Sequence, residues 1–171
     1  MNDLLEHHAA AVFRFALRMT GDHHAAEDVA QEALLRAWRK RSGLDDTRAT
    51  RAWLLTIAAN VWRDQLRRAK LRRSESLPAD GHASREPSPL RTVTARDEAS
   101  RAVALMDTLP ARQREVLYLF SCEGLSLEEI AAVLATNRDA VKANLHLARK
   151  RMRSLWSNAK NETIRTNQKR P

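Results

Sequence analysis

The amino-acid sequence predicts an all-α protein made of two small helical domains joined by a flexible linker. Residues that favour helix dominate the 171-residue chain, because Ala, Leu, Arg and Glu are its commonest types. Only 4 Gly and 5 Pro are present, which is too few for a turn-rich all-β fold. Apolar residues recur at helical spacing on both sides of a segment that lacks this spacing, residues 75–97.

The domain predicted over residues 1–74 contains three helices. The first ends at Thr20-Gly21-Asp22, the second is expected over 24–41, and the third over 51–73. Each carries an apolar stripe, and that of the third helix lies within an arc of roughly 100°. The residues expected to form this core are Leu4, Leu5, Val12, Phe15, Ala16, Met19, Ala26, Ala30, Leu34, Ala37, Trp38, Trp53, Leu54, Ile57 and Val61.

The other side of the second helix is a candidate binding surface. Five residues share it: Asp28, Gln31, Glu32, Leu35 and Arg39. One interpretation is a solvated face, in which Glu32 pairs with Arg36 one helical turn later. The other is a surface for a protein partner, because a leucine lies among the acids.

A basic run follows the apolar stripe of the third helix. Its bases are Arg63, Arg67, Arg68, Lys70, Arg72 and Arg73. A solubilising face is one explanation. The other is single-stranded nucleic acid, where cations follow the phosphates and flat side chains meet unstacked bases. The second hypothesis includes Asn60 and Trp62, which lie next to the basic run. Trp62 lies away from the core stripe, whereas Trp53 is expected in the core.

Residues 75–97 are predicted to be a flexible linker, because they hold three of the five prolines, no aromatic residue and no apolar periodicity. The polar, basic segment 156–171 is predicted to be disordered. The net charge of +9 divides into +4 over residues 1–75, 0 over 76–97, +2 over 98–155 and +3 over 156–171. This excess indicates a polyanionic partner, with nucleic acid ahead of an acidic membrane surface.

The second domain, predicted over residues 98–155, begins with two short helices. They are expected over 102–109 and 113–120. A proline at position 110 separates them, because proline cannot continue the first helix.

A helix–turn–helix is predicted to follow these two helices. Gly124 suits a left-handed helix end, and Ser126 suits an N-cap with Glu129 completing a capping box. A short turn at 135–137 then leads into a last helix that begins at Arg138.

The last helix has an apolar face and an adjoining basic face. The apolar face comprises Val141, Leu145, Ala148, Met152 and Leu155. The basic face comprises Arg138, Lys142, His146, Arg149 and Arg153. Such a helix after a tight turn is the arrangement that docks in the DNA major groove, where it presents bases to phosphates and base edges. The alternative is a surface helix with solvated charges.

Enzymatic, metal-binding and membrane classes are not favoured. The only cysteine, Cys122, cannot form an internal disulfide, and no Cys-x-x-Cys pair exists. The pairs His7-His8 and His23-His24 point about 100° apart on a helix, unlike chelating pairs one turn apart. There is no signal peptide, apolar run long enough to span a bilayer, nucleophile elbow or phosphate loop, so we expect a cytoplasmic protein without metal or cofactor.

Three segments resemble the bacterial sigma factors of the extracytoplasmic-function (group IV) type. Residues 26–38, Ala-Glu-Asp-Val-Ala-Gln-Glu-Ala-Leu-Leu-Arg-Ala-Trp, resemble the most characteristic segment of that family. Residues 51–60 resemble its promoter-melting segment, and residues 109–131 resemble the start of its fourth region. The three occur in the family's order around a linker, and the length fits a type that keeps only the second and fourth regions.

The resemblance implies an alternative transcription initiation factor, not an enzyme, which binds core RNA polymerase and directs it to promoters. It implies that core polymerase is contacted by Asp28, Gln31, Glu32 and Leu35. It implies that the minus-ten element is bound and opened by Asn60, Trp62, Arg63, Arg67 and Arg68. It implies that the minus-thirty-five element is bound by Arg138, Lys142, Asn144, His146, Arg149 and Arg153. It also implies an anti-sigma factor as a partner.

The recognition helix departs from the family pattern. Where the family usually carries Gly-Thr-Val-Lys-Ser-Arg, residues 139–144 are Asp-Ala-Val-Lys-Ala-Asn, so the resemblance does not carry a base preference. Asn144 can bond either an adenine edge or a phosphate, although it lies on the flank opposite the basic face. The alternative function is a helix–turn–helix regulator that does not act as a sigma factor, which would not need the Asp28-x-x-Gln31-Glu32 pattern.

Overall fold

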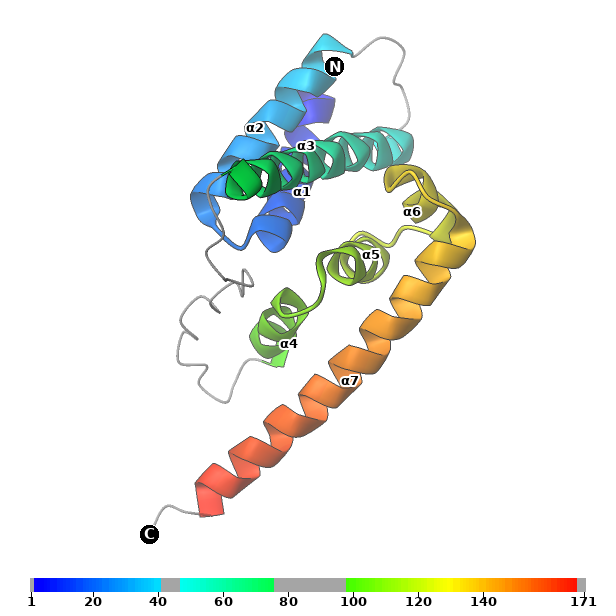
Figure 1. Ribbon diagram of the computed structural model, residues 1–171. Coiled ribbons are helices and arrows are strands. Elements are labelled where there is room, and N and C mark those ends of the chain that lie inside the picture. Colours follow the sequence, from blue (N-terminus) through cyan, green and yellow to red (C-terminus); the bar gives the residue numbers. More distant parts are fainter. Residues whose placement is uncertain (1, 41–46, 76–97, 169–171) are drawn as a thin grey trace.

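The structure, a computed structural model, describes residues 2–40, 47–75 and 98–168 (Figure 1). Within these residues it contains seven α-helices and no strand, which confirms the predicted all-α class. The helices are α1 (Asn2–Thr20), α2 (His23–Arg39), α3 (Thr47–Glu75), α4 (Glu98–Asp107), α5 (Ala111–Ser121), α6 (Leu127–Val133) and α7 (Arg138–Gln168). Glu75 is the last residue of α3, and the rest of the predicted linker lies outside the described residues.

Helices α1, α2 and α3 pack on one another as the first helical unit (Figure 1). Asp22 begins α2 as its N-cap, accepting a hydrogen bond at its Oδ1 from the Ala25 N–H at 2.8 Å. Small side chains line the buried side of α2, which lets the neighbouring helices approach closely. The buried apolar residues of this unit include Val12, Phe15, Ala16, Met19, Ala26, Val29, Ala30, Ala33, Ala37, Leu54, Leu55, Ala58, Ala59 and Val61.

Two tryptophans correct the sequence analysis. Trp38, expected in the core, is 42% exposed, and Trp62, expected to be open, is only 4% exposed. Trp53, expected in the core, is half-buried and packs against the core cluster as expected. Because α2 turns Ala37 inward, the next residue points about 100° away, toward solvent. Helix α3 packs on α1 and α2 and also on α6, so its buried arc is wider than one stripe and includes Trp62.

The start of α6 confirms the predicted capping box. Gly124 has a positive φ of 67°, which only glycine adopts without steric cost. The Ser126 Oγ accepts a hydrogen bond from the Glu129 N–H at 3.1 Å, and the Glu129 carboxylate accepts one from the Ser126 N–H at 2.7 Å. After the turn, the Asn137 Oδ1 accepts from the Ala140 N–H at 2.8 Å and so caps α7, which begins at Arg138 as predicted.

Helix α7 continues beyond its predicted end. The segment 156–171 was expected to be disordered, but α7 extends through it to Gln168, so that expectation is wrong for residues 156–168. Once a helix is nucleated, each added residue gains a hydrogen bond at little further cost. Packing also contributes, because the guanidinium of Arg101 in α4 lies over the half-buried Trp156 ring, 5.6 Å from its centroid.

The two helical units are packed against each other. Helix α3 contacts α6 and α1 contacts α5, although each pair joins parts of the chain far apart in sequence (Figure 1). At this junction the rings of Phe15 and Tyr118 meet edge to face with centroids 5.9 Å apart. Their buried side chains belong to one apolar cluster that runs through both units.

Candidate functional site

The outer face of α2 exposes two large apolar side chains within a polar surface. Leu35 is 46% exposed and Trp38, one turn later, is 42% exposed. Asp28 and Gln31 lie exposed on the same helix, while Glu32 is half-buried. Exposed apolar groups rimmed by polar ones are typical of protein–protein interfaces. We call the surface formed by Asp28, Gln31, Glu32, Leu35 and Trp38 the α2 face. The sequence did not predict Trp38 as part of this surface, because its helical spacing placed that residue in the core.

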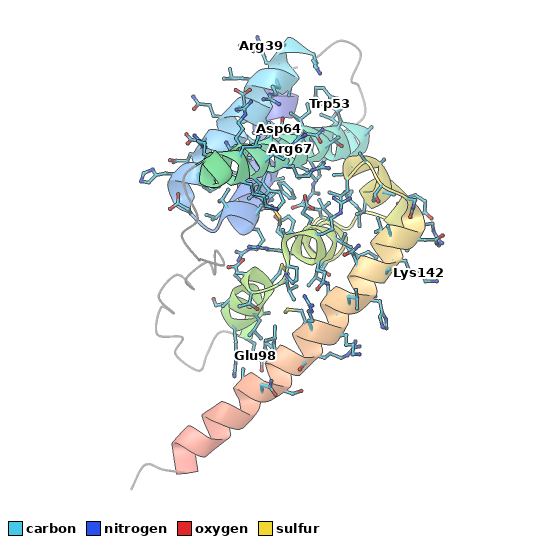
Figure 2. All side chains as sticks on the ribbon, in the orientation of Figure 1. Arg39, Trp53, Asp64, Arg67, Glu98 and Lys142 are labelled. Atoms are coloured by element: carbon cyan, nitrogen blue, oxygen red, sulfur yellow. The ribbon has the colours of Figure 1, made fainter. Side chains whose placement is uncertain are left out.

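The predicted ion pair on α2 is present, and it links α2 to α3. The Arg36 Nε donates to Glu32 Oε1 at 2.7 Å, and an Arg36 nitrogen lies 3.7 Å from an Asp64 carboxylate oxygen of α3. Asp64 also accepts a hydrogen bond from Arg67, which holds the pKa of the Asp64 carboxyl below its usual range. Asp64 therefore stays ionised among the bases and contacts two of them, Arg36 and Arg67; Asp64 and Arg67 are labelled in Figure 2.

The basic run of α3 borders an open hollow of about 380 Å³. Its lining residues are Asn60, Arg63, Asp64, Leu66, Arg67 and Lys70. Asn60, Arg67 and Arg68 are exposed, as a nucleic-acid contact requires. The combination of amide, guanidinium and ammonium groups offers hydrogen bonds to a base edge and charge to a phosphate. Trp62 is buried beside this run and presents no open ring face to a base.

Arg63 is engaged within the protein. Its Nε donates to the Ala59 carbonyl at 3.0 Å, and its Nη2 donates to the Asn60 Oδ1 at 2.9 Å. The same guanidinium reaches the end of α6, where it donates to the carbonyls of Leu134 at 3.2 Å and Val133 at 3.4 Å. One arginine of the predicted nucleic-acid surface thus joins α3 to the first helix of the helix–turn–helix.

Helix α7 separates its apolar and basic faces as predicted. Val141, Leu145 and Ala148 are buried, and Met152 and Leu155 are half-buried. The five bases of the predicted basic face are exposed, and Lys142 projects outward in Figure 2.

Three of the residues predicted to contact DNA on α7 are also engaged within the domain. Arg138 pairs with Glu128 of α6 across the turn. The Arg149 guanidinium lies 4.7 Å from the centroid of the Phe120 ring. Asn144 is half-buried and donates to the Ala140 carbonyl of its own helix at 2.8 Å. Exposed bases without such contacts, above all Lys142, are therefore the best placed for a phosphate.

Two other kinds of site are absent from the described ranges 2–40, 47–75 and 98–168. No three His, Cys, Asp or Glu side chains in them are grouped so as to hold a metal ion. None of the helices in these ranges combines the length and the apolar character needed to cross a bilayer.

Comparison with known proteins identifies the family. Residues 4–72 match Sigma-70 region 2, and residues 100–152 match Sigma-70, region 4. The chain therefore belongs to the sigma-70 family of transcription initiation factors, with region 2 formed by α1–α3 and region 4 by α4–α7.

The relatives narrow this family to one type. The chain is 38% identical over 154 residues to the ECF RNA polymerase sigma factor SigL of Mycobacterium tuberculosis (strain H37Rv), covering 90% of this chain and 86% of SigL. It is 32% identical over 160 residues to the RNA polymerase sigma factor CnrH of Cupriavidus metallidurans, covering 89% and 84%. The chain is thus an alternative sigma factor of the extracytoplasmic-function type, and the regulator alternative is not favoured.

Solved structures agree with this assignment. The sigma factor RpoE of Bartonella quintana, in complex with the anti-sigma factor NepR, matches with a TM-score of 0.69 and 26% identity over 91% of this chain and 96% of that chain. CnrH in complex with the cytosolic domain of CnrY matches with a TM-score of 0.63 and 25% identity, covering 92% and 87%.

Proposed function

We propose that this sigma factor divides its work among three surfaces. The α2 face binds core RNA polymerase. Asn60, Arg63, Arg67 and Arg68 on α3 bind the opened minus-ten element. The basic face of α7 binds the minus-thirty-five element, with Lys142 as its principal phosphate contact. The protein acts in the cytoplasm, where polymerase and promoters meet.

The exposed pair Leu35 and Trp38 carries the polymerase assignment. Fully burying such a side chain contributes about 1.5–3 kcal/mol. Because 46% of Leu35 and 42% of Trp38 are still exposed, roughly half of this remains to be gained when a partner covers them. The acids beside them explain why this partner is protein: anionic side chains repel the phosphates of DNA and suit a basic or polar protein surface.

The experiment measures binding of fluorescently labelled Leu35→Asp to purified core polymerase by anisotropy. The variant should bind at least tenfold more weakly than the wild type, because a carboxylate replaces a side chain that the complex buries. Val103→Asp is the matched control, because Val103 is also an exposed apolar residue, 38% exposed, but lies on α4. Equal affinity of Leu35→Asp and Val103→Asp would contradict the assignment.

The DNA assignment on α7 is tested by the dependence of binding on salt. Lys142→Ala should weaken binding of duplex promoter DNA and reduce the slope of log K against log salt by about one unit. Lys150→Ala provides the control, since Lys150 is an exposed lysine of the same helix outside the basic face. A slope that responds equally to both changes would exclude a specific role for Lys142.

An anti-sigma factor is proposed as a further partner. The two similar solved structures support this proposal, because each is a complex of a sigma factor with a partner, NepR in one case and the cytosolic domain of CnrY in the other. Loss of promoter-specific transcription in the presence of such a partner, and its return when the partner is removed, would be the expected result.

A further inference from the structure

Helix α7 carries an exposed apolar patch on the side opposite its buried face. Leu147 is 46% exposed, and Ala143 is exposed one helical turn before it. At 100° per residue, both lie about 160° around the helix from Leu145, which is buried against the rest of region 4. The packing of α7 on α5 and α6 therefore leaves these two side chains in water.

The position of this patch distinguishes it from a scattered surface leucine, which needs no explanation. Going round the helix, the exposed Lys142 is followed by the exposed His146, and then by Ala143 and Leu147. The apolar patch thus adjoins the basic face without a break. Both lie in the first three turns of α7, directly after the turn that separates it from α6.

The geometry of the DNA major groove gives the two surfaces different neighbours. The groove is about 12 Å wide, and a helix with its side chains is about 10–12 Å across, so the helix fills it. The flanks of a docked helix face the phosphates, and its outermost side faces the base edges. With Lys142 directed at a phosphate strand, the residues that follow it round the helix face the bases.

The side chains that most often read bases are engaged elsewhere. Arginine pairs with guanine and asparagine with adenine in the major groove. Over residues 138–149, these residue types are Arg138, Asn144 and Arg149, and each has the partner within the domain described above. The side of α7 that faces the bases is left with His146 and the two hydrocarbon side chains.

A hydrocarbon side chain has one specific target among the base edges. Thymine presents a C5-methyl group in the major groove, and the other three bases present only hydrogen-bonding groups there. We propose that Leu147, with Ala143 beside it, packs against the C5-methyl group of a thymine in the minus-thirty-five element. This inference rests on the proposed function of α7 and adds a base preference to it, which contacts to phosphates cannot supply.

Uracil provides a direct test of this contact, because it pairs with adenine as thymine does and lacks only the C5-methyl group. The full-length wild-type chain is used to select fluorescein-labelled DNA duplexes from a randomised pool. Each thymine of the enriched duplex is then replaced by uracil, one at a time, and the affinity is measured by gel mobility shift at fixed salt. The free chain is suitable, because Lys142, Ala143 and Leu147 are all exposed in it.

Uracil at one or more of these positions should weaken wild-type binding about fourfold, the factor that corresponds to the burial of one methyl group. Leu147→Ala should bind the thymine duplex at least fourfold more weakly and show no difference between thymine and uracil at that position. Alanine favours helix, so this variant should remain folded, which circular dichroism checks. Val103→Ala is the matched control, because Val103 is an exposed apolar residue of α4, and it should retain the wild-type difference.

Three results would overturn the inference. They are a pool that yields no enriched duplex containing thymine, a wild-type chain that binds every uracil duplex as tightly as the thymine duplex, and a Leu147→Ala variant that retains the wild-type difference. A failure of the proposed function is distinguishable, because Lys142→Ala then leaves the salt dependence unchanged. A reduced slope for Lys142→Ala without any response to uracil contradicts the Leu147 contact alone.

Discussion

The capping box at the start of α6 supports a quantitative prediction. Helix α6 has only seven residues, so the hydrogen bonds at its ends are a large share of its total. Ser126→Ala removes the oxygen that accepts from the Glu129 N–H and leaves that donor without its partner within the helix. Loss of a serine N-cap costs about 1 kcal/mol of the free energy of unfolding. For a chain of this length, that loss lowers Tm by about 3 °C.

Urea unfolding followed by circular dichroism measures this loss. Ser126→Asp keeps a side-chain acceptor at the cap and should retain most of the stability. Ser154→Ala is the matched control, because Ser154 lies exposed on α7 and alanine favours helix more than serine does. The reasoning is refuted if Ser126→Ala is as stable as the wild type, or if Ser154→Ala loses as much stability as Ser126→Ala.

Two further substitutions test the buried side chains of Glu115 and Trp62. Burial raises the pKa of the Glu115 carboxyl above its ordinary value of 4.5, so the folded chain holds this proton more tightly than the unfolded chain does. The stability contributed by Glu115 is therefore present below pH 4.5 and lost as the pH rises through the raised pKa. Glu115→Gln should flatten the fall in unfolding free energy above pH 4.5, measured by urea unfolding at a series of pH values. An unchanged slope of unfolding free energy against pH would argue against this. Trp62→Ala should cost about 3–5 kcal/mol of unfolding free energy, because it leaves a cavity where a buried side chain was. A urea midpoint that is nearly the same for the variant and the wild type would instead indicate that Trp62 is exposed and faces DNA.

Features set by neighbouring residues were predictable from the sequence. Gly124, Ser126 and Glu129 determine a helix start through contacts within a few residues, and the structure confirms each of them. The same holds for the buried face of α7, because helical spacing alone places Val141 and Leu145 on one side. The three family motifs likewise carried the function, since they are continuous segments of sequence.

Features set by contacts between distant segments were not predictable in this way. Trp38 and Trp62 exchanged their expected positions because burial depends on which helices pack around α2 and α3. Arg18 and Asp107 are 89 positions apart, and nothing local to either residue indicates that they pair. Their contact depends on how the two regions associate, and so does the engagement of Arg63 by α6.

The length of α7 has a mechanical consequence. Its 31 residues form one continuous helix about 47 Å long, and the bases proposed to read DNA lie in its first half. A hydrogen-bonded helix bends little, so a tilt of about 10° at one end moves the other by about 8 Å. The far half thus works as a lever arm. A modest force on its tip would exert a large torque on the end proposed to dock in the groove, at a point far from the proposed DNA contacts.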